Sequence, residues 1–231
     1  MELKLEEWSV EGFLVKRDPS KNKSAEEYLA VEKINISEKI KKRFRDVLSD
    51  YICDENYVFD LDLKDFKEFM SDDSKDKNYK VSKTELGKQN NYFNQLLGLI
   101  NEENSENNLA TGNFSKYHSI ILKFSKGNQE LFYFRKLSRV KVGKRKFHIY
   151  EGHIEEIEKD LIFFDEFIDF IYFKNFTVEG NTDKERNILN EKILIFNRDN
   201  FKTLFRLYEY CIQKAKEFFE KFDFIEIADI E

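Results

Sequence analysis

The stretch 117–137 constrains the fold most, because it has the pattern of a hairpin whose two strands are apolar on both faces. The runs YHSIILKF (117–124) and ELFYFRKL (130–137) flank the turn-forming residues Ser-Lys-Gly-Asn-Gln. Strands that carry apolar residues on both sides are typical of the inside of a sheet. We therefore expect this hairpin to be a central part of a sheet that other segments cover.

Other segments predict further strands and helices around this hairpin. Alternation or short apolar runs predict strands at 9–17, 28–36, 57–63, 161–164, 169–173 and 192–196, and a second hairpin at 139–149. Helical spacing predicts helices after Ser37 (38–52) and from about Thr84 to Ile100. A long C-terminal helix is expected after Asn197, with an apolar stripe that includes Phe201, Leu204, Phe205 and Tyr208. This order favours an α+β fold with a largely antiparallel sheet, built from two consecutive hairpins and later strands and packed by amphipathic helices.

A polar stretch divides the chain internally. NEENSENNLATGN (101–113) has almost no apolar content and is rich in turn-forming residues. It separates an N-terminal α/β part, 1–105, from an α+β core, 111–231. Neither part alone has enough apolar helix to cover its predicted strands, so we expect one continuous globular unit.

Composition excludes several classes of protein. The chain has 231 residues, a net charge of -6 and 41% hydrophobic residues, which is enough to bury a substantial core. Cys53 and Cys211 are far apart in sequence and form no Cys-x-x-Cys motif, so neither a zinc ribbon nor a disulfide framework is predicted. No apolar run approaches the roughly 20 residues that span a bilayer. No glycine-rich phosphate loop and no GxSxG motif is present, so the sequence predicts neither a cofactor nor a catalytic residue. We expect a reduced, cytoplasmic protein.

The charge is divided unevenly along the chain. Residues 111–147 contain ten basic residues and one acid, Glu130, and so carry +9. The rest of the chain, with 29 basic and 44 acidic residues, carries -15. A net negative charge therefore conceals a strongly positive segment, and does not exclude a polyanionic partner.

The second predicted hairpin, 139–149, would gather these cations on one face. If Gly143 and Lys144 form a two-residue turn, Lys141 faces Lys146 and Arg139 faces His148, while the apolar residues share the opposite face. Opposed like charges are mutually destabilising, and a polyanion would offset this. The predicted nucleic-acid-binding residues are Lys123, Lys126, Arg135, Lys136, Arg139, Lys141, Lys144, Arg145, Lys146 and His148. On duplex DNA, about five phosphate contacts would give a slope of roughly -4 to -5 in a plot of the logarithm of the binding constant against the logarithm of the salt concentration.

Other uses of these residues remain open. The basic face could be a solvated ridge, or could dock against acidic residues of this chain or of a protein partner. Asp60, Asp62, Asp165 and Asp169 lie on predicted strands and raise the alternative of a metal-dependent nuclease. His118, His148 and His153 fit no zinc template, so no metal site is predicted. A homo-oligomer is also compatible with the sequence.

Three features follow one another in the C-terminal half, over roughly Tyr117 to Lys216. They are a predicted strand with Arg135 and Lys136, an apolar segment in which Phe164 is followed five residues later by Asp169, and an apolar strand, 193–195, followed by Asn197 and a helix that contains Phe201. By these features the C-terminal half resembles the Kiwa B family of bacterial anti-phage proteins, whose pattern is a strand with an Arg-Lys pair, an apolar segment ending in Phe-x-x-x-x-Asp, and an apolar strand followed by Asn and a Phe-containing helix.

The resemblance implies a DNA-binding effector of phage defence that cooperates with a membrane-embedded partner, Kiwa A. Any membrane association would then come through that partner. It implies no catalytic centre. We therefore expect a non-enzymatic protein that holds DNA, without sequence preference, through the basic hairpin face.

Overall fold

The computed structural model describes most of the chain that precedes the C-terminal segment. The described residues are 5–17, 29–53, 61–71, 78–89, 91–102, 109–110, 112–113, 117–136, 148–150, 153–154, 168–176, 189–205 and 207. Most of the second predicted hairpin (139–147), the predicted strand at 57–60 and the C-terminal helix beyond residue 207 lie outside them.

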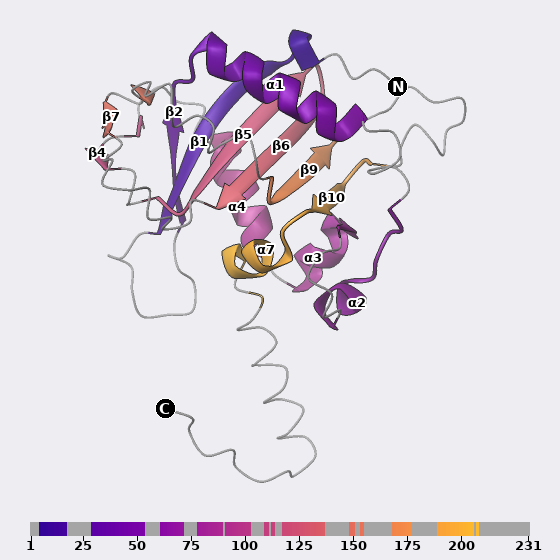
Figure 1. Ribbon diagram of the computed structural model, residues 1–231. Coiled ribbons are helices and arrows are strands. Elements are labelled where there is room, and N and C mark those ends of the chain that lie inside the picture. Colours follow the sequence, from indigo (N-terminus) through magenta and orange to yellow (C-terminus); the bar gives the residue numbers. More distant parts are fainter. Residues whose placement is uncertain are drawn as a thin grey trace, which may run out of the picture.

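The core element is a seven-stranded sheet in which every neighbouring pair is antiparallel. Its order is β2 (Leu29–Ile34), β1 (Ser9–Arg17), β5 (Ser119–Lys126), β6 (Gln129–Lys136), β9 (Phe170–Lys174), β10 (Lys192–Ile195) and β3 (Tyr79–Ser82). This confirms the predicted α+β fold with its largely antiparallel sheet (Figure 1). The sheet takes strands from both sides of the 101–113 stretch.

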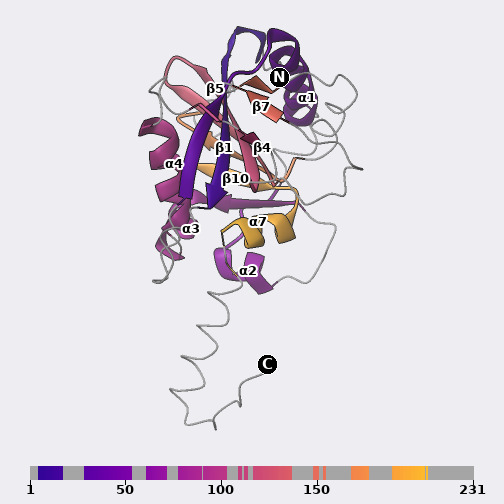
Figure 2. The same cartoon turned by 90° about the vertical axis from the view of Figure 1, so that its left-hand side faces the viewer.

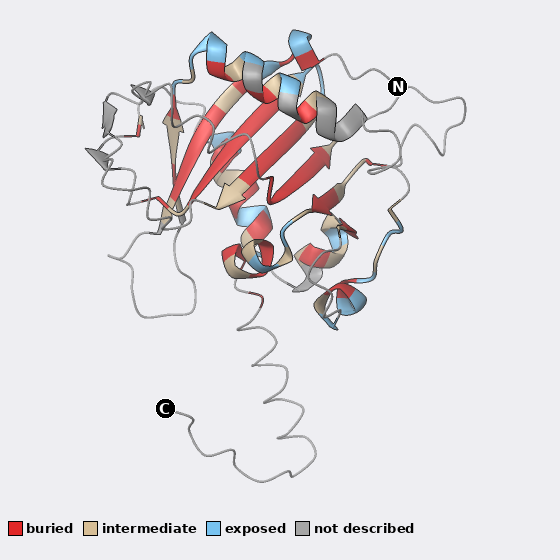
Figure 3. Cartoon of the chain, viewed as in Figure 1, coloured by how far each residue is buried: buried red, intermediate tan, exposed pale blue. Residues whose placement is uncertain are grey.

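The predicted first hairpin lies at the centre of this sheet. β5 and β6 pair from Ser119 opposite Lys136 to Lys126 opposite Gln129. The turn between them has Gly127 with a φ of 59°, a conformation that costs glycine little and other residues about 1 kcal/mol or more. Six consecutive β5 residues from Ser119 are buried, which accounts for a strand that is apolar on both sides (Figure 3).

Helices cover both faces of the sheet. α1 (Glu38–Cys53) crosses one face and buries Ile40, Phe44 and Leu48 against it. The opposite face packs against α2 (Phe66–Ser71), α4 (Tyr92–Glu102) and α7 (Arg198–Leu204), and Leu86 of α3 (Lys83–Gln89) joins the same core. Figure 2 shows the sheet between α1 and the α3–α4 pair. We call these the α1 face and the α4 face.

The core on the α4 face is dominated by aromatic rings. Phe134 stacks on Phe170 with ring centroids 4.3 Å apart, and Phe201 of α7 meets Phe170 edge-on at 4.9 Å. Phe69 of α2 packs against the same Phe201 at 5.6 Å. The phenylalanine-rich composition therefore joins four separate elements, β6, β9, α7 and α2, into one cluster, because each ring buries a large apolar area.

The helical prediction for residues 84–100 was wrong in one respect, since two helices occupy this stretch. α4 begins after Asn91, whose carbonyl oxygen accepts the N–H of Gln95 at 3.0 Å. Asparagine favours such helix starts because its short polar side chain competes with the helical backbone. α2 and β3 were not predicted; both are short, and β3 contains a lysine and a serine that weaken an apolar pattern.

A smaller sheet consists of β4 (Gly112–Asn113), β7 (His148–Tyr150) and β8 (His153–Ile154), in the order β4-β7-β8. It lies beside β2 (Figure 1). The link between the two sheets is a bridge between Leu109 and Lys33 of β2, three residues before β4 begins. Within the described part of the chain, no helix is both long and apolar enough to cross a bilayer.

Candidate nucleic-acid interface

The structure places only some of the predicted basic residues. Lys123, Lys126, Arg135 and Lys136 belong to the β5–β6 hairpin. His148 begins β7, where its paired residue is Asn113 of β4. The remaining five, Arg139, Lys141, Lys144, Arg145 and Lys146, lie outside the described residues, as does the predicted pairing of Arg139 with His148.

Lys123 is buried and does not belong to an exposed basic surface. It is 7% exposed, and its Nζ lies 2.6 Å from Oε1 of Glu130. The same ammonium group lies 3.5 Å from the Asn101 side chain of α4 and 5.8 Å from the centre of the Phe132 ring. A lysine held in this way is a partner of the chain's own acid, so its predicted phosphate contact does not agree with its position.

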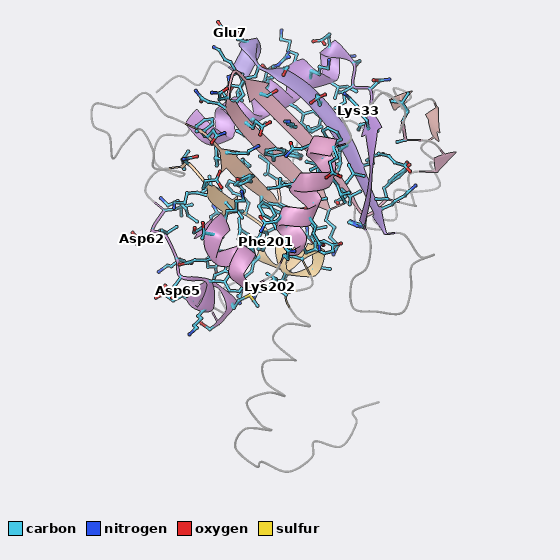
Figure 4. All side chains as sticks on the ribbon, turned by 180° about the vertical axis from the view of Figure 1, so that it is seen from behind. Glu7, Lys33, Asp62, Asp65, Phe201 and Lys202 are labelled. Atoms are coloured by element: carbon cyan, nitrogen blue, oxygen red, sulfur yellow. The ribbon has the colours of Figure 1, made fainter. Side chains whose placement is uncertain are left out.

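Lys126 lies at the exposed turn of the hairpin and pairs with Glu7. Both side chains are about half exposed, and ion pairs of this kind contribute at most about 1 kcal/mol. Figure 4 shows Glu7 at the end of the described fold that lies away from Lys202 of α7. Because about half of its side chain is exposed, Lys126 is accessible.

Arg135 and Lys136 lie at the other end of the hairpin and are half-buried. A strand rises about 3.4 Å per residue, so β6 separates them from the Lys126 turn by roughly 20 Å. The four predicted residues on this hairpin therefore do not form one surface. Only Arg135 and Lys136 are continuous in sequence with the other predicted cations, and we call residues 135–146 the basic segment.

Glu130 is the one acid of the +9 window, and it is fully engaged inside the sheet. Its two carboxylate oxygens accept hydrogen bonds from the ammonium groups of Lys123 and Lys174, at 2.6 and 2.5 Å. Burial raises the pKa of Glu130, but the two lysine hydrogen bonds outweigh this and hold it below its ordinary value. The acid is thus taken up by two lysines that do not belong to the basic segment.

Glu130 belongs to a polar row that closes the end of the α4 face. Ser9 and Ser125 share a hydrogen bond of 2.7 Å on the two strands beside it. On the other side, Glu191 accepts the Tyr172 hydroxyl at 2.9 Å and lies 3.1 Å from Lys83 Nζ. Burial and this carboxylate raise the pKa of Tyr172, so the phenol stays protonated. The row satisfies its polar groups internally.

Lysines elsewhere in the sheet also have acidic partners. Lys33 Nζ lies 2.7 Å from Oε1 of Glu11 on the neighbouring strand, and Lys16 pairs with Glu32. On α1, Lys41 Nζ lies 2.7 Å from Oε1 of Glu38. These pairs account for part of the acidic remainder of the chain, because acids outside the +9 window neutralise lysines outside that window.

Asp169 is buried, and groups of the chain itself donate hydrogen bonds to its carboxylate. It is 2% exposed, Oδ2 accepts the backbone N–H of Lys136 at 2.5 Å, and Oδ1 accepts the Asn200 amide at 2.7 Å. Burial raises its pKa, against the effect of these hydrogen bonds and of the nearby Arg135 and Lys136 charges. Both carboxylate oxygens are therefore held by the chain itself.

The other residues of the nuclease alternative do not gather around Asp169 in the described structure. Asp62 is exposed in the segment before α2, and Asp60 and Asp165 lie outside the described residues. His118 Nδ1 lies 3.0 Å from the Ser119 hydroxyl, and His153 pairs with Tyr150 in the small sheet. Among the described residues, no three His, Cys, Asp or Glu side chains form a group that could hold a metal ion.

Several residues on which the family resemblance rests meet at one place, while Phe164 lies outside the described residues. The backbone carbonyl of Asp169 accepts the N–H of Asn197 at 3.0 Å, and Asn197 caps α7 by accepting the N–H of Asn200 at 2.9 Å. Phe201 follows in the aromatic core, while Lys136 binds the Asp169 carboxylate. The predicted start of a helix directly after Asn197 is confirmed.

Sequence reasoning missed the partners Lys174 and Asn200. Lys174 follows an apolar strand and Asn200 lies in the first turn of a helix, and both patterns also occur at ordinary surface positions. Only the register opposes Lys174 to Glu130. No protein-family model, no curated protein and no solved structure matches this chain.

Proposed function

We propose that this protein binds the phosphate backbone of DNA through the basic segment. Between Glu130 and Glu151 the sequence carries seven basic residues and no acid. They are Arg135, Lys136, Arg139, Lys141, Lys144, Arg145 and Lys146. A cation density of this kind is the usual electrostatic footprint of backbone binding, which needs no sequence-specific contact.

The engagement of Glu130 is the observation that carries this proposal. A short basic stretch is often neutralised by an acid close to it in sequence, which would remove its attraction for phosphate. Glu130, the one acid of the window, is instead paired with Lys123 and Lys174, one lysine at each carboxylate oxygen. Removing Lys123 and Glu130 together from the window leaves its charge at +9, and that charge belongs to residues other than the buried pair.

The resemblance to the Kiwa B family supports a biological setting for this binding. In that setting the protein is a non-enzymatic effector of anti-phage defence that holds phage DNA and acts together with a membrane-embedded Kiwa A protein. The hydrogen bonding of Asp169 agrees with a binding role, because a carboxylate satisfied by the chain itself is not arranged to bind a catalytic metal.

A salt titration of duplex DNA binding tests the proposal. The wild-type chain is expected to bind with a slope of roughly -4 to -5 in log K against log salt, the value for about five phosphates. The double substitution Lys141→Glu/Lys146→Glu should weaken binding and reduce the slope by about 2, one unit for each lost contact.

The matched control is Lys42→Glu/Lys67→Glu, which changes the net charge equally at two exposed lysines on α1 and α2. It should leave the slope unchanged. Salt-independent or absent DNA binding by the wild type would refute the proposal. Equal losses in the two double variants would show that net charge, not the basic segment, governs binding.

A further inference from the structure

The connection between β6 and β9 contains most of the basic segment. A hydrogen bond between Lys136 and Asp169 joins the two ends of this connection. Lys136 is the last residue of β6, and Asp169 immediately precedes β9. Residues 137–168 lie between them. The ends of this connection are joined directly, because the Lys136 N–H donates to the Asp169 carboxylate at 2.5 Å.

This hydrogen bond ends the pairing of β6 with β9. Phe134 opposite Phe170 is the last pair of the ladder, and the N–H of Asp169 donates to the Phe134 carbonyl at 3.2 Å. Beyond this pair, the N–H of Lys136 bonds to a side chain instead of to a neighbouring strand. The two strands therefore separate at a defined residue, and the chain leaves the sheet at Lys136.

The other carboxylate oxygen attaches α7 to the same point. Oδ1 of Asp169 accepts the Asn200 amide at 2.7 Å, and the Asp169 carbonyl accepts the N–H groups of Phe196 and Asn197 at 2.8 and 3.0 Å. Asn200 lies in the first turn of α7, which packs into the aromatic core through Phe201. One residue thus joins the end of β6, the start of β9 and the start of α7.

We propose that Asp169 is a positioning residue for the basic segment, because its carboxylate clips both ends of the 137–168 connection to the sheet and to α7. We call its bonds to Lys136 and Asn200 the Asp169 clip. Closing the base of a connection lowers the number of conformations that it can adopt. The inference rests on the proposed DNA binding, and it assigns to Asp169 the task of fixing the start of the basic segment at Lys136.

Two substitutions at this position separate hydrogen bonding from charge. Asp169→Asn removes the charge, but its carbonyl can accept the Lys136 N–H, and its amide can donate to Asn200 once Asn200 turns its own amide. Asp169→Ala removes the same charge and both acceptors. If Asp169 acted only by its charge, both variants would bind DNA equally and more tightly than the wild type, because a negative charge near Arg135 and Lys136 has been removed.

The test measures duplex DNA binding over a range of salt for wild type, Asp169→Asn and Asp169→Ala. We expect Asp169→Ala to lose at least about one unit of salt slope, which corresponds to one phosphate contact, while Asp169→Asn keeps the wild-type slope. Gly12→Ala serves as a control for lower stability, since it alters packing in β1 without touching the clip. If the wild type binds DNA, equal binding by the Asn and Ala variants would overturn the proposal.

Two readouts without DNA keep this inference separate from the proposed function. Lys136 amide exchange and the rate of tryptic cleavage at Arg139 to Lys146 should both increase in Asp169→Ala, but not in Asp169→Asn or Gly12→Ala. Asn200→Ala, which removes one donor only, should give a smaller increase. If the wild type fails to bind DNA but these rates change as expected, the proposed function fails and the clip stands. Unchanged rates in Asp169→Ala would refute the clip, whatever the DNA result.

Discussion

At the scale of single residues, the position of a charge in the sheet decides its role. Lys123 and Lys126 are three residues apart on one strand, yet one is buried against Glu130 and the other is exposed beside Glu7. Removing a carboxylate from a buried ionic contact leaves an uncompensated cation in a poorly solvated place, which is strongly destabilising. An exposed pair loses little, because water replaces the missing partner.

Glu130→Gln should therefore lower the free energy of unfolding by about 2 to 3 kcal/mol near pH 7. The pKa of Glu130 lies below the ordinary value for glutamate, which is about 4. The ionised carboxylate therefore stabilises the fold fully at pH values above that ordinary value, and this stabilisation is lost as the pH falls through the lowered pKa. Urea titrations of wild type and variant at pH 7 and near pH 3 measure this. The difference between the two proteins should shrink at the acidic pH.

Glu7→Gln is the matched control, because it neutralises the acid of the exposed Lys126 pair. Its effect on the free energy of unfolding should stay below about 1 kcal/mol. Equal effects of the two substitutions would contradict the burial argument. So would a Glu130→Gln difference that grows as the pH falls.

The predicted role of Lys123 shows what a sequence pattern can convey about a single residue. Lys123 lies among apolar residues on a strand predicted to be inside the sheet, so its burial was foreseeable, whereas its partners were not. These partners are Glu130 of β6 and Asn101 of α4. The β5–β6 register pairs Lys123 with Phe132, and Glu130 is the next residue of β6 on the same face of the sheet. A charge count along the chain does not contain this information.

At the scale of elements, the glycines show how the same substitution has different consequences in a helix and in a strand. Gly98 lies within α4, and no atom lies within 4 Å of the position where a Cβ would be added. Gly12 lies in β1, where an added Cβ would be 2.4 Å from Cδ1 of Ile36 and 2.7 Å from Cγ1 of Ile34. The first site has space, and the second is filled by side chains of the neighbouring segment.

We expect Gly98→Ala to raise the free energy of unfolding by up to about 1 kcal/mol, because alanine loses less backbone freedom in a helix. Gly12→Ala should lower it by about 1 to 3 kcal/mol, because Ile34 and Ile36 must move. Urea titration of both variants at one pH measures the two signs. A loss of stability in Gly98→Ala, or none in Gly12→Ala, would contradict the packing that the structure shows.

The long elements were predictable from sequence, and most of the short ones were not. β1, β2, β5 and β6 and the helix α1 follow clear apolar periods over several residues, and the four-residue β10 was predicted from its unbroken apolar run 193–195. α2, β3 and the break between α3 and α4 depend on only a few residues each, and packing on the sheet supplies most of their stability. A short segment carries too few positions for its period to be distinguished.

At the scale of the whole molecule, the sheet joins both halves of the sequence. β1 separates β2 from β5, while β3 pairs with β10 at the opposite edge. β5 is buried on both of its faces and pairs with β1 along almost its whole length. Without the N-terminal part, β5 would become an exposed edge strand with apolar residues on both faces.

Separate expression of residues 1–105 and 109–231 tests this dependence. Neither piece alone should show a cooperative unfolding transition, because each leaves large apolar surfaces of the sheet uncovered. Mixing the pieces from denaturant should restore a transition, measured by circular dichroism and by their co-elution on a sizing column. A cooperative transition of 109–231 alone would show that this part folds independently.

The sequence by itself determined the two features that belong to neighbouring residues: the apolar periods of the long strands and helices, and the division of charge between the +9 window and the remainder. Only the tertiary structure decided which charges neutralise each other and where the basic segment leaves the sheet. Glu130 and Lys174 are 44 residues apart in sequence, and Lys136 and Asp169 are 33 apart. Such pairs form because strand register and burial bring distant groups together, and a local pattern records neither.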